Sequence, residues 1–329
     1  FRSNSGLKTP AAMAVRSVAV HPGNSSIVLR AGGSVVNGKL KSGLWRSEDG
    51  GQSWKLVTNE IDFDGGGPTT LFGEVVMFCP LDPNLVVAGG ETKGFFISRD
   101  AGETWTSAGL SGERITSMAF SPQAEKNTNS PAVVVGTFAD SEFKSLGLEK
   151  PVTPTEGPGR IYWVTIPDEG ARIKASKVCE LTDFGVTNLV FDTQRNFVNF
   201  ATTRGVYYTW SHCALYAKRQ LGASGDRFFT AIGARPFDKW SKFTCAAPFS
   251  GSEQSPVHFT TERSRNWSAL SDTSQLDEDS AEVALNAGIS CLLPDAGEDN
   301  TFFLCNRHGV FKTTEKGESY RLVLRASEK

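Results

Sequence analysis

The sequence has few of the features that identify a membrane span, a metal ribbon or a familiar catalytic loop. None of its apolar runs approaches the ~20 residues needed to cross a bilayer. Its six cysteines include no CxxC pair, and its four histidines have no metal-ligand spacing. No GxSxG elbow, Walker loop or GxGxxG motif follows a predicted strand. We therefore expect no membrane insertion, no metal and no cofactor.

The chain also lacks an excess of charge of either sign and any sustained helical pattern. Lys and Arg number 34 against 36 Asp and Glu, a net charge of −2, which gives no reason to expect a nucleic-acid partner. No segment repeats apolar residues at i, i+3 and i+4 for several turns, so long helices are not predicted. The high counts of Gly (33) and Phe (22) are typical of many short strands joined by tight turns. An all-β fold is predicted.

One eight-residue pattern occurs twice, at Ser47–Trp54 and at Ser98–Trp105. Both copies read hydroxyl, x, Asp, x, Gly, x, hydroxyl, Trp, and both follow a short apolar strand that begins with glycine. In a hairpin, the Asp carboxylate can accept backbone N–H groups across a tight turn, and the Gly can supply a positive φ. The Trp begins the next strand and can pack under the turn.

This pattern resembles the Asp-box (BNR) repeat of β-propellers, found in sialidases, xyloglucanase-type glycoside hydrolases, sortilin-type receptors and a photosystem II assembly factor. The resemblance implies that the boxes lie on peripheral turns and stabilise the fold rather than catalyse. A degenerate third copy keeps the spacing. The residues to which the resemblance gives a structural role are Ser47, Asp49, Gly51, Trp54, Ser98, Asp100, Gly102, Trp105, Glu315, Gly317 and Tyr320.

A four-strand pattern recurs about every 50 residues, which is propeller periodicity. We predict one domain, residues 1–329, forming a single β-propeller of four-stranded antiparallel blades. Six blades are favoured and seven are the alternative. The predicted units are approximately 13–58, 72–109, 114–182, 186–222, 226–272 and 281–326.

Two loop segments contain the candidate site residues. The connection 59–73 carries Asp62 and Asp64, followed by Glu74, and these are the best acid–base candidates. The same composition also suits a solvated turn or a calcium-binding loop. The insertion 138–158 is either a partner-docking arm or a tolerated surface insertion. The candidate ligand-binding residues in and after it are Asp140, Glu142, Lys144 and Arg160.

Two functions fit these observations. The first is a non-catalytic propeller that binds a protein or a glycan through the loop-bearing face of its channel. The alternative is a xyloglucanase- or sialidase-like glycoside hydrolase, in which two carboxylates ~5–5.5 Å or ~6.5–9.5 Å apart would act together. We favour the binding protein because no recognisable catalytic set is present. The sequence predicts no oligomeric state.

Two further features of the sequence bear on the cellular compartment and on the state of one cysteine pair. Sequons at Asn24 and Asn266 are compatible with a secreted or extracytoplasmic protein. Cys291 and Cys305 are predicted on adjacent antiparallel strands, where they form either a disulfide or a pair of free thiols.

Overall fold

The computed structural model describes part of the chain, and within this part all regular structure is β. The described residues are 15–37, 39–63, 72–121, 129–138, 159–168, 172–181, 185–192, 197–210, 216–218, 229–234, 244–248, 258–260, 268–269, 289, 291–295, 301–306, 309–314 and 319–325. They contain no helix long and apolar enough to span a membrane. The chain divides into two compact units, Phe1–Gly185 and Val186–Lys329.

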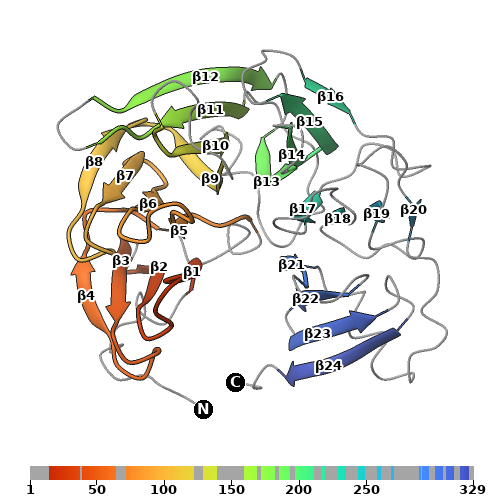
Figure 1. Cartoon of the computed structure of the whole chain (residues 1–329), viewed down its shortest axis with the longest axis horizontal. Coiled ribbons are helices and arrows are strands. Elements are labelled where there is room, and N and C mark those ends of the chain that lie inside the picture. The colour runs from red at the N-terminus through yellow and green to blue at the C-terminus, as the bar shows by residue number, and fades with distance from the viewer. Residues whose placement is uncertain are drawn as a thin grey trace. The chain divides into compact units, whose positions relative to one another are not determined.

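The first unit contains three four-stranded antiparallel sheets, and in each the four strands pair in chain order (Figure 1). Sheet 1 comprises β1 (Ser17–Val20), β2 (Val28–Val36), β3 (Lys39–Ser47) and β4 (Lys55–Thr58). Sheet 2 comprises β5 (Val76–Phe78), β6 (Val86–Gly89), β7 (Phe95–Ser98) and β8 (Thr106–Gly109). Sheet 3 comprises β9 (Arg114–Phe120), β10 (Ala132–Phe138), β11 (Gly159–Thr165) and β12 (Lys174–Leu181).

The second unit repeats the same arrangement three times. Sheet 4 comprises β13 (Val186–Asp192), β14 (Phe197–Thr202), β15 (Gly205–Trp210) and β16 (Tyr216–Lys218). Sheet 5 comprises β17 (Phe229–Ala234), β18 (Thr244–Pro248), β19 (His258–Thr260) and β20 (Ser268–Ala269). Sheet 6 comprises β21 (Cys291–Pro294), β22 (Phe302–Asn306), β23 (Gly309–Thr314) and β24 (Ser319–Arg325).

The structure confirms the all-β class and the four-stranded antiparallel blades but corrects the predicted assembly. The prediction of a single propeller with six blades, or with seven, is wrong because the sheets fall into two compact units of three each. The break at Val186 coincides with the start of the predicted fourth unit. A repeat pattern reports how often a blade recurs along the chain, whereas the grouping of blades depends on contacts between them, which the repeat does not encode.

The core of the first unit lies between neighbouring sheets. Every residue of β10 is buried, so its sequence AVVVGTF shows none of the alternation typical of a strand with one solvated face. Its β-branched side chains pack well on a pleated surface. Apolar residues from all three sheets meet in one cluster, including Leu29, Phe95 and Val133. In the second unit, hydroxyl groups connect successive sheets: Thr187 donates to the carbonyl of Phe229, and Thr230 to that of Ile289.

The glycines that begin the third strands have a structural cause. A Cβ atom on Gly94 or Gly309 would lie 2.5 or 2.1 Å from a carbonyl oxygen of the adjacent outer strand. The pairing register shifts directly after these residues, between Phe95 and Phe96 and between Val310 and Phe311. β7 and β23 therefore start with a bulge that brings two backbones too close for any side chain.

The first hairpin is long: β2 and β3 pair continuously from Val28 and Ser47 out to Val36 and Lys39. Asn37 has a φ of 52° between them, the conformation required in a tight two-residue hairpin turn. The Asn-Gly dipeptide at 37–38 is the sequence signal for this turn, and the sequence analysis did not use it.

Candidate functional site

The first copy of the eight-residue pattern, Ser47–Trp54 (the first box), folds as a turn organised by the Asp49 carboxylate. Asp49 accepts hydrogen bonds from the Ser47 hydroxyl at 2.8 Å and from the backbone N–H and hydroxyl of Ser53 at 2.8 and 2.5 Å. Gly50 and Gly51 have φ values of 70° and 88°, so the predicted positive φ is confirmed. Every acceptor bond is made inside the turn, which makes Asp49 a structural carboxylate.

The second box repeats this geometry on sheet 2. Asp100 accepts from the Ser98 hydroxyl at 2.7 Å and from the N–H and hydroxyl of Thr104 at 2.9 and 2.5 Å. The Trp105 indole N–H donates to the Gly102 carbonyl at 3.1 Å, so the Trp closes the turn from below. Partial burial acts to raise the pKa of Asp100, but the hydrogen bonds together outweigh it and lower the pKa.

Hydrogen bonds from Ser53 and then from Ser47 lower the pKa of Asp49 to about 2. Because an unfolded Asp titrates near pH ~3.9, this carboxylate stabilises the fold above about pH 4, and its contribution is lost as the pH falls through about 2. We expect Asp49→Asn to lower Tm at pH 6 and to have a progressively smaller effect toward pH 2.5. Thermal unfolding of both proteins across this range measures the difference. A constant difference in Tm would contradict the assignment.

At the opposite end of sheet 2, Asp62 connects two loops. Its carboxylate accepts from the N–H and hydroxyl of Thr92 at 2.9 and 2.5 Å and from the N–H of Lys93 at 3.0 Å. Its backbone carbonyl accepts the N–H of Glu91 at 2.9 Å. The half-buried Asp62 thus holds the loop after β6 in place with both oxygens. These contacts support a positioning role for a residue that the sequence indicated as an acid–base candidate.

Ion pairs fix the neighbouring loops at this end. Glu91 pairs with Arg114, and both side chains are largely buried. Arg160 donates to Glu180 at 3.0 Å and to Glu113 at 2.9 Å, and Glu113 also accepts the Tyr162 hydroxyl at 2.7 Å. The hydrogen bond to Glu180 and the Glu113 charge raise the pKa of Arg160. Arg160, a predicted ligand-binding residue, is therefore neutralised by two acids.

Glu74 contacts the first strands of sheets 1 and 3 and shortly precedes the first strand of sheet 2. It accepts the Ser17 hydroxyl at 2.5 Å, and its backbone carbonyl accepts the N–H of Met118 at 2.9 Å. The buried Arg16 donates to the Gly73 and Thr116 carbonyls, both at 2.8 Å. The Glu74 residue has solvent-accessible surface, yet protein atoms surround its carboxyl group and desolvate it. This desolvation raises the pKa of Glu74 by more than the hydrogen bond from Ser17 and the charge of Arg16 lower it.

Several predicted site residues lie outside the described residues: Asp64, Asp140, Glu142, Lys144, Glu315 and Gly317. Tyr320 lies in β24 opposite Thr313, as the degenerate box requires. The structure thus brings Asp62 and Glu74 to one end of the first unit and both intact boxes to the other. Sequence analysis missed Ser17, Glu91, Glu113 and Arg114, since single polar residues at strand ends carry no distinctive pattern.

Cys291 and Cys305 face each other directly across β21 and β22, which confirms their predicted adjacency, and no disulfide joins them. A hydrogen bond from Cys291 lowers the pKa of Cys305, whereas burial raises the pKa of Cys79. Because the thiolate is the reactive form, we expect iodoacetamide at pH 7 to alkylate Cys305 faster than Cys79. Peptide mass spectrometry over a time course measures both rates. Cys291→Ala should slow the alkylation of Cys305. An alkylation rate of Cys305 equal to that in the wild type would refute the hydrogen-bond effect.

No protein-family model matches the chain, and no curated protein matches it in sequence. Solved structures do match in three dimensions. A GH74 enzyme from Niastella koreensis superposes with a TM-score of 0.69 at 15% identity, covering 91% of this chain and 45% of that one. The GH74 xyloglucanase from Xanthomonas campestris gives 0.72 at 13%, covering 98% and 49%. The chain thus spans about half the length of these enzymes.

A structure of YCF48 bound to a D1 peptide gives a TM-score of 0.58 at 12% identity. This match covers 97% of this chain and 86% of that one. Identities this low carry no information about a site, because one fold serves many unrelated functions. What the matches show is the type of fold, that of β-propellers built from four-stranded antiparallel blades.

Proposed function

We propose that this protein is a non-catalytic propeller that binds a segment of a partner protein through the loops around Asp62, Glu91 and Arg160. The observation that carries the proposal is the state of the carboxylates. Asp62 is held by loop N–H groups, and Glu91 and Glu113 pair with arginines. General acid–base catalysis needs a carboxylate free to exchange a proton with substrate, and these three are occupied by internal contacts.

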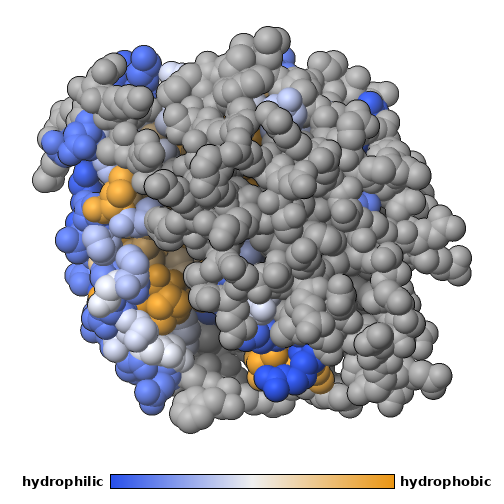
Figure 2. All heavy atoms as spheres, turned by 45° about the vertical axis from the view of Figure 1, so that its right-hand side comes forward, coloured by the Kyte–Doolittle hydropathy of each residue, from blue (hydrophilic) through white to orange (hydrophobic). Residues whose placement is uncertain are grey.

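The same contacts favour binding. Loops fixed by buried ion pairs and hydrogen bonds lose little conformational entropy when a partner docks. In Figure 2 the coloured residues are mostly hydrophilic, with hydrophobic side chains in small separate groups. YCF48, whose solved structure contains a bound D1 peptide, supports a protein rather than a glycan ligand. The proposal includes membership of the Asp-box family. It also includes an extracytoplasmic location, since the Asn24 of the first glycosylation sequon is exposed.

Affinity capture from an extract of the source cells, with quantitative mass spectrometry, tests the binding face. Lys93→Glu reverses an exposed charge there but keeps the backbone N–H that Asp62 accepts. We expect this variant to lose proteins that the wild type captures, whereas Lys55→Glu on the outer strand of sheet 1 should retain them. Identical capture by both variants would argue against this face.

A glycoside hydrolase remains the second candidate because Glu74 has a raised pKa, as a general acid requires. We expect no hydrolysis of xyloglucan oligosaccharides or sialosides by the wild type at pH 4–8. Turnover that Glu74→Gln abolishes, in a variant that remains folded by circular dichroism, would replace the binding proposal with an enzyme. A glycan array in parallel tests carbohydrate binding without turnover.

A further inference from the structure

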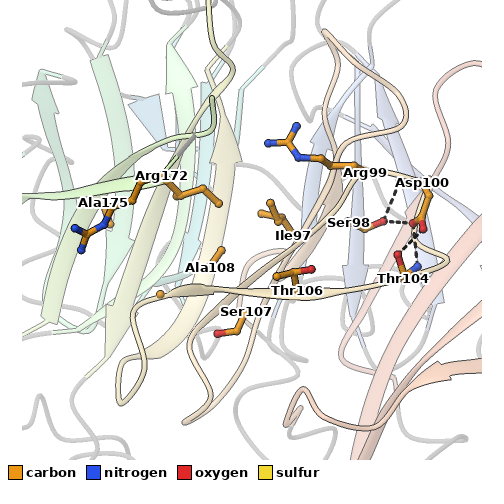
Figure 3. Close-up of a pocket in the computed structure, with 12 residues that line it drawn as sticks. Ile97, Ser98, Arg99, Asp100, Thr104, Thr106, Ser107, Ala108, Arg172 and Ala175 are labelled. Carbon is orange, nitrogen blue, oxygen red and sulfur yellow. Dashed lines mark hydrogen bonds between the residues drawn. The ribbon is translucent and has the colours of Figure 1, made fainter. Parts of the chain in front are cut away.

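A second surface of the first unit has features of a binding site, and it lies apart from the loops around Asp62, Glu91 and Arg160. A pocket of about 910 Å³ opens between sheet 2 and the start of the outer strand of sheet 3 (Figure 3). One wall is formed by the end of β7, the second Asp box and β8, and the other by residues 172–175. Its volume lies within the range of about 300–1,000 Å³ typical of ligand sites.

One side of this pocket is a free sheet edge. β8 is the last strand of sheet 2, and among the described strands it pairs only with β7. Thr106 and Ser107 are exposed there, and both line the pocket. An edge strand presents unpaired N–H and C=O groups, to which an extended peptide can add as a further strand. The pocket therefore offers backbone recognition along one wall.

The charges of the pocket favour an acidic ligand. Arg99 and Arg172 both line it, and the exposed Arg172 makes no ion pair or hydrogen bond within the described part of the chain. Arg99 reaches across to donate one N–H to the Pro167 carbonyl, which holds its guanidinium in place. The single lining carboxylate, Asp100, already accepts four hydrogen bonds inside its box. Two arginines therefore line the cavity, against one acid whose oxygens are occupied.

Ile97, Ala108 and Ile173 complete the lining with apolar surface. A strand added beside β8 alternates its side chains between two faces, so one face can contact this apolar surface while acidic side chains reach the arginines. Arginine suits such a contact because its planar donor fork matches a carboxylate. We propose that this pocket binds an extended acidic peptide segment of a partner protein, which adds to β8 as a fifth strand.

The test is fluorescence anisotropy with a labelled eight-residue peptide of alternating glutamate and valine. Two matched probes separate the interactions: glutamine in place of glutamate removes the charge, and N-methylation of alternate amides removes the backbone donors. We expect only the unmodified peptide to bind measurably. Arg172→Met should weaken its binding roughly three- to fivefold, and Arg99→Met/Arg172→Met roughly tenfold or more.

Lys55→Met, which removes an exposed cation from sheet 1, should leave peptide binding unchanged. The double variant also loses the Arg99 contact with Pro167, which could disturb the fold. The Arg172 single variant keeps that contact and therefore tests the charge effect alone. Absence of binding, equal affinity for the glutamine peptide, or unchanged affinity in the double variant would overturn the acidic-peptide assignment. Equal binding of the N-methylated peptide would overturn strand addition. Each result is independent of the loop-face proposal, whose test uses Lys93.

Discussion

Gly94→Ala is expected to destabilise the first unit by about 3–5 kcal/mol, the sum of backbone strain and overpacking. Gly94 has a φ of 82°, and a Cβ atom there would lie 2.5 Å from the Gly109 carbonyl oxygen and from the C and O atoms of Leu110. All three are backbone atoms of the outer strand and the residue after it, so no side chain can move aside. Thermal unfolding should show Tm lowered by roughly 10 °C or more.

Gly112→Ala provides a matched control. Gly112 has nearly the same backbone conformation, with a φ of 86°, but no atom lies within 4 Å of a Cβ built there. Alanine at this position incurs only the left-handed strain, about 1–2 kcal/mol. The difference between the two variants therefore isolates the steric contact behind the bulge. Equal losses of Tm would show that the contact contributes nothing.

Arg16→Met is expected to cost about 3 kcal/mol, because methionine fills much of the same space but donates no hydrogen bond. Arg16 is 7% exposed and connects sheet 1 to the starts of the first strands of sheets 2 and 3. Without it, the Gly73 and Thr116 carbonyls lose a charged donor in a buried site. Urea unfolding monitored by tryptophan fluorescence measures the change.

The penalty of Arg16→Met should also depend on pH. Arg16 compensates the charge of Glu74, whose pKa is raised in the folded protein. A raised carboxyl pKa means that stability falls as the pH rises above the unfolded value of ~4.3 and Glu74 ionises. We therefore expect a larger loss at pH 8 than at pH 5, whereas Arg172→Met, at an exposed position, should show no loss at either. A pH-independent loss would remove Glu74 from the explanation.

The sequence contained much of the local structure. The order hydroxyl, Asp, Gly, hydroxyl, Trp determines the box turns because the hydrogen bonds to the Asp carboxylate and to the first hydroxyl join residues at most four positions apart. Glycine at or directly before the start of β7, β11, β15 and β23, and apolar runs such as 132–135, also predicted strands where the structure has them. Local patterns can specify turns and strands because the interactions that form them lie within a few residues.

The candidate site depended on contacts that no local pattern contains. Asp62 and Glu74 looked like an acid–base pair, yet Asp62 is held by residues 30 and 31 positions later and Glu74 by Ser17, 57 positions earlier. The partners of Arg160 likewise come from two other segments, through Glu113 and Glu180. Whether a carboxylate is free or occupied is decided by such distant neighbours.

The sequence by itself therefore determined the β class, the four-stranded repeat and the hydrogen bonds within the turns at 47–54 and 98–105. Only the tertiary structure decided how the repeats group into two units, which charges are neutralised and where a pocket remains open beside β8. The physical reason is the separation along the sequence between the residues that interact. Hydrogen bonds within a turn follow from the order of residues, whereas burial, ion pairing and free sheet edges depend on which distant strands pack together.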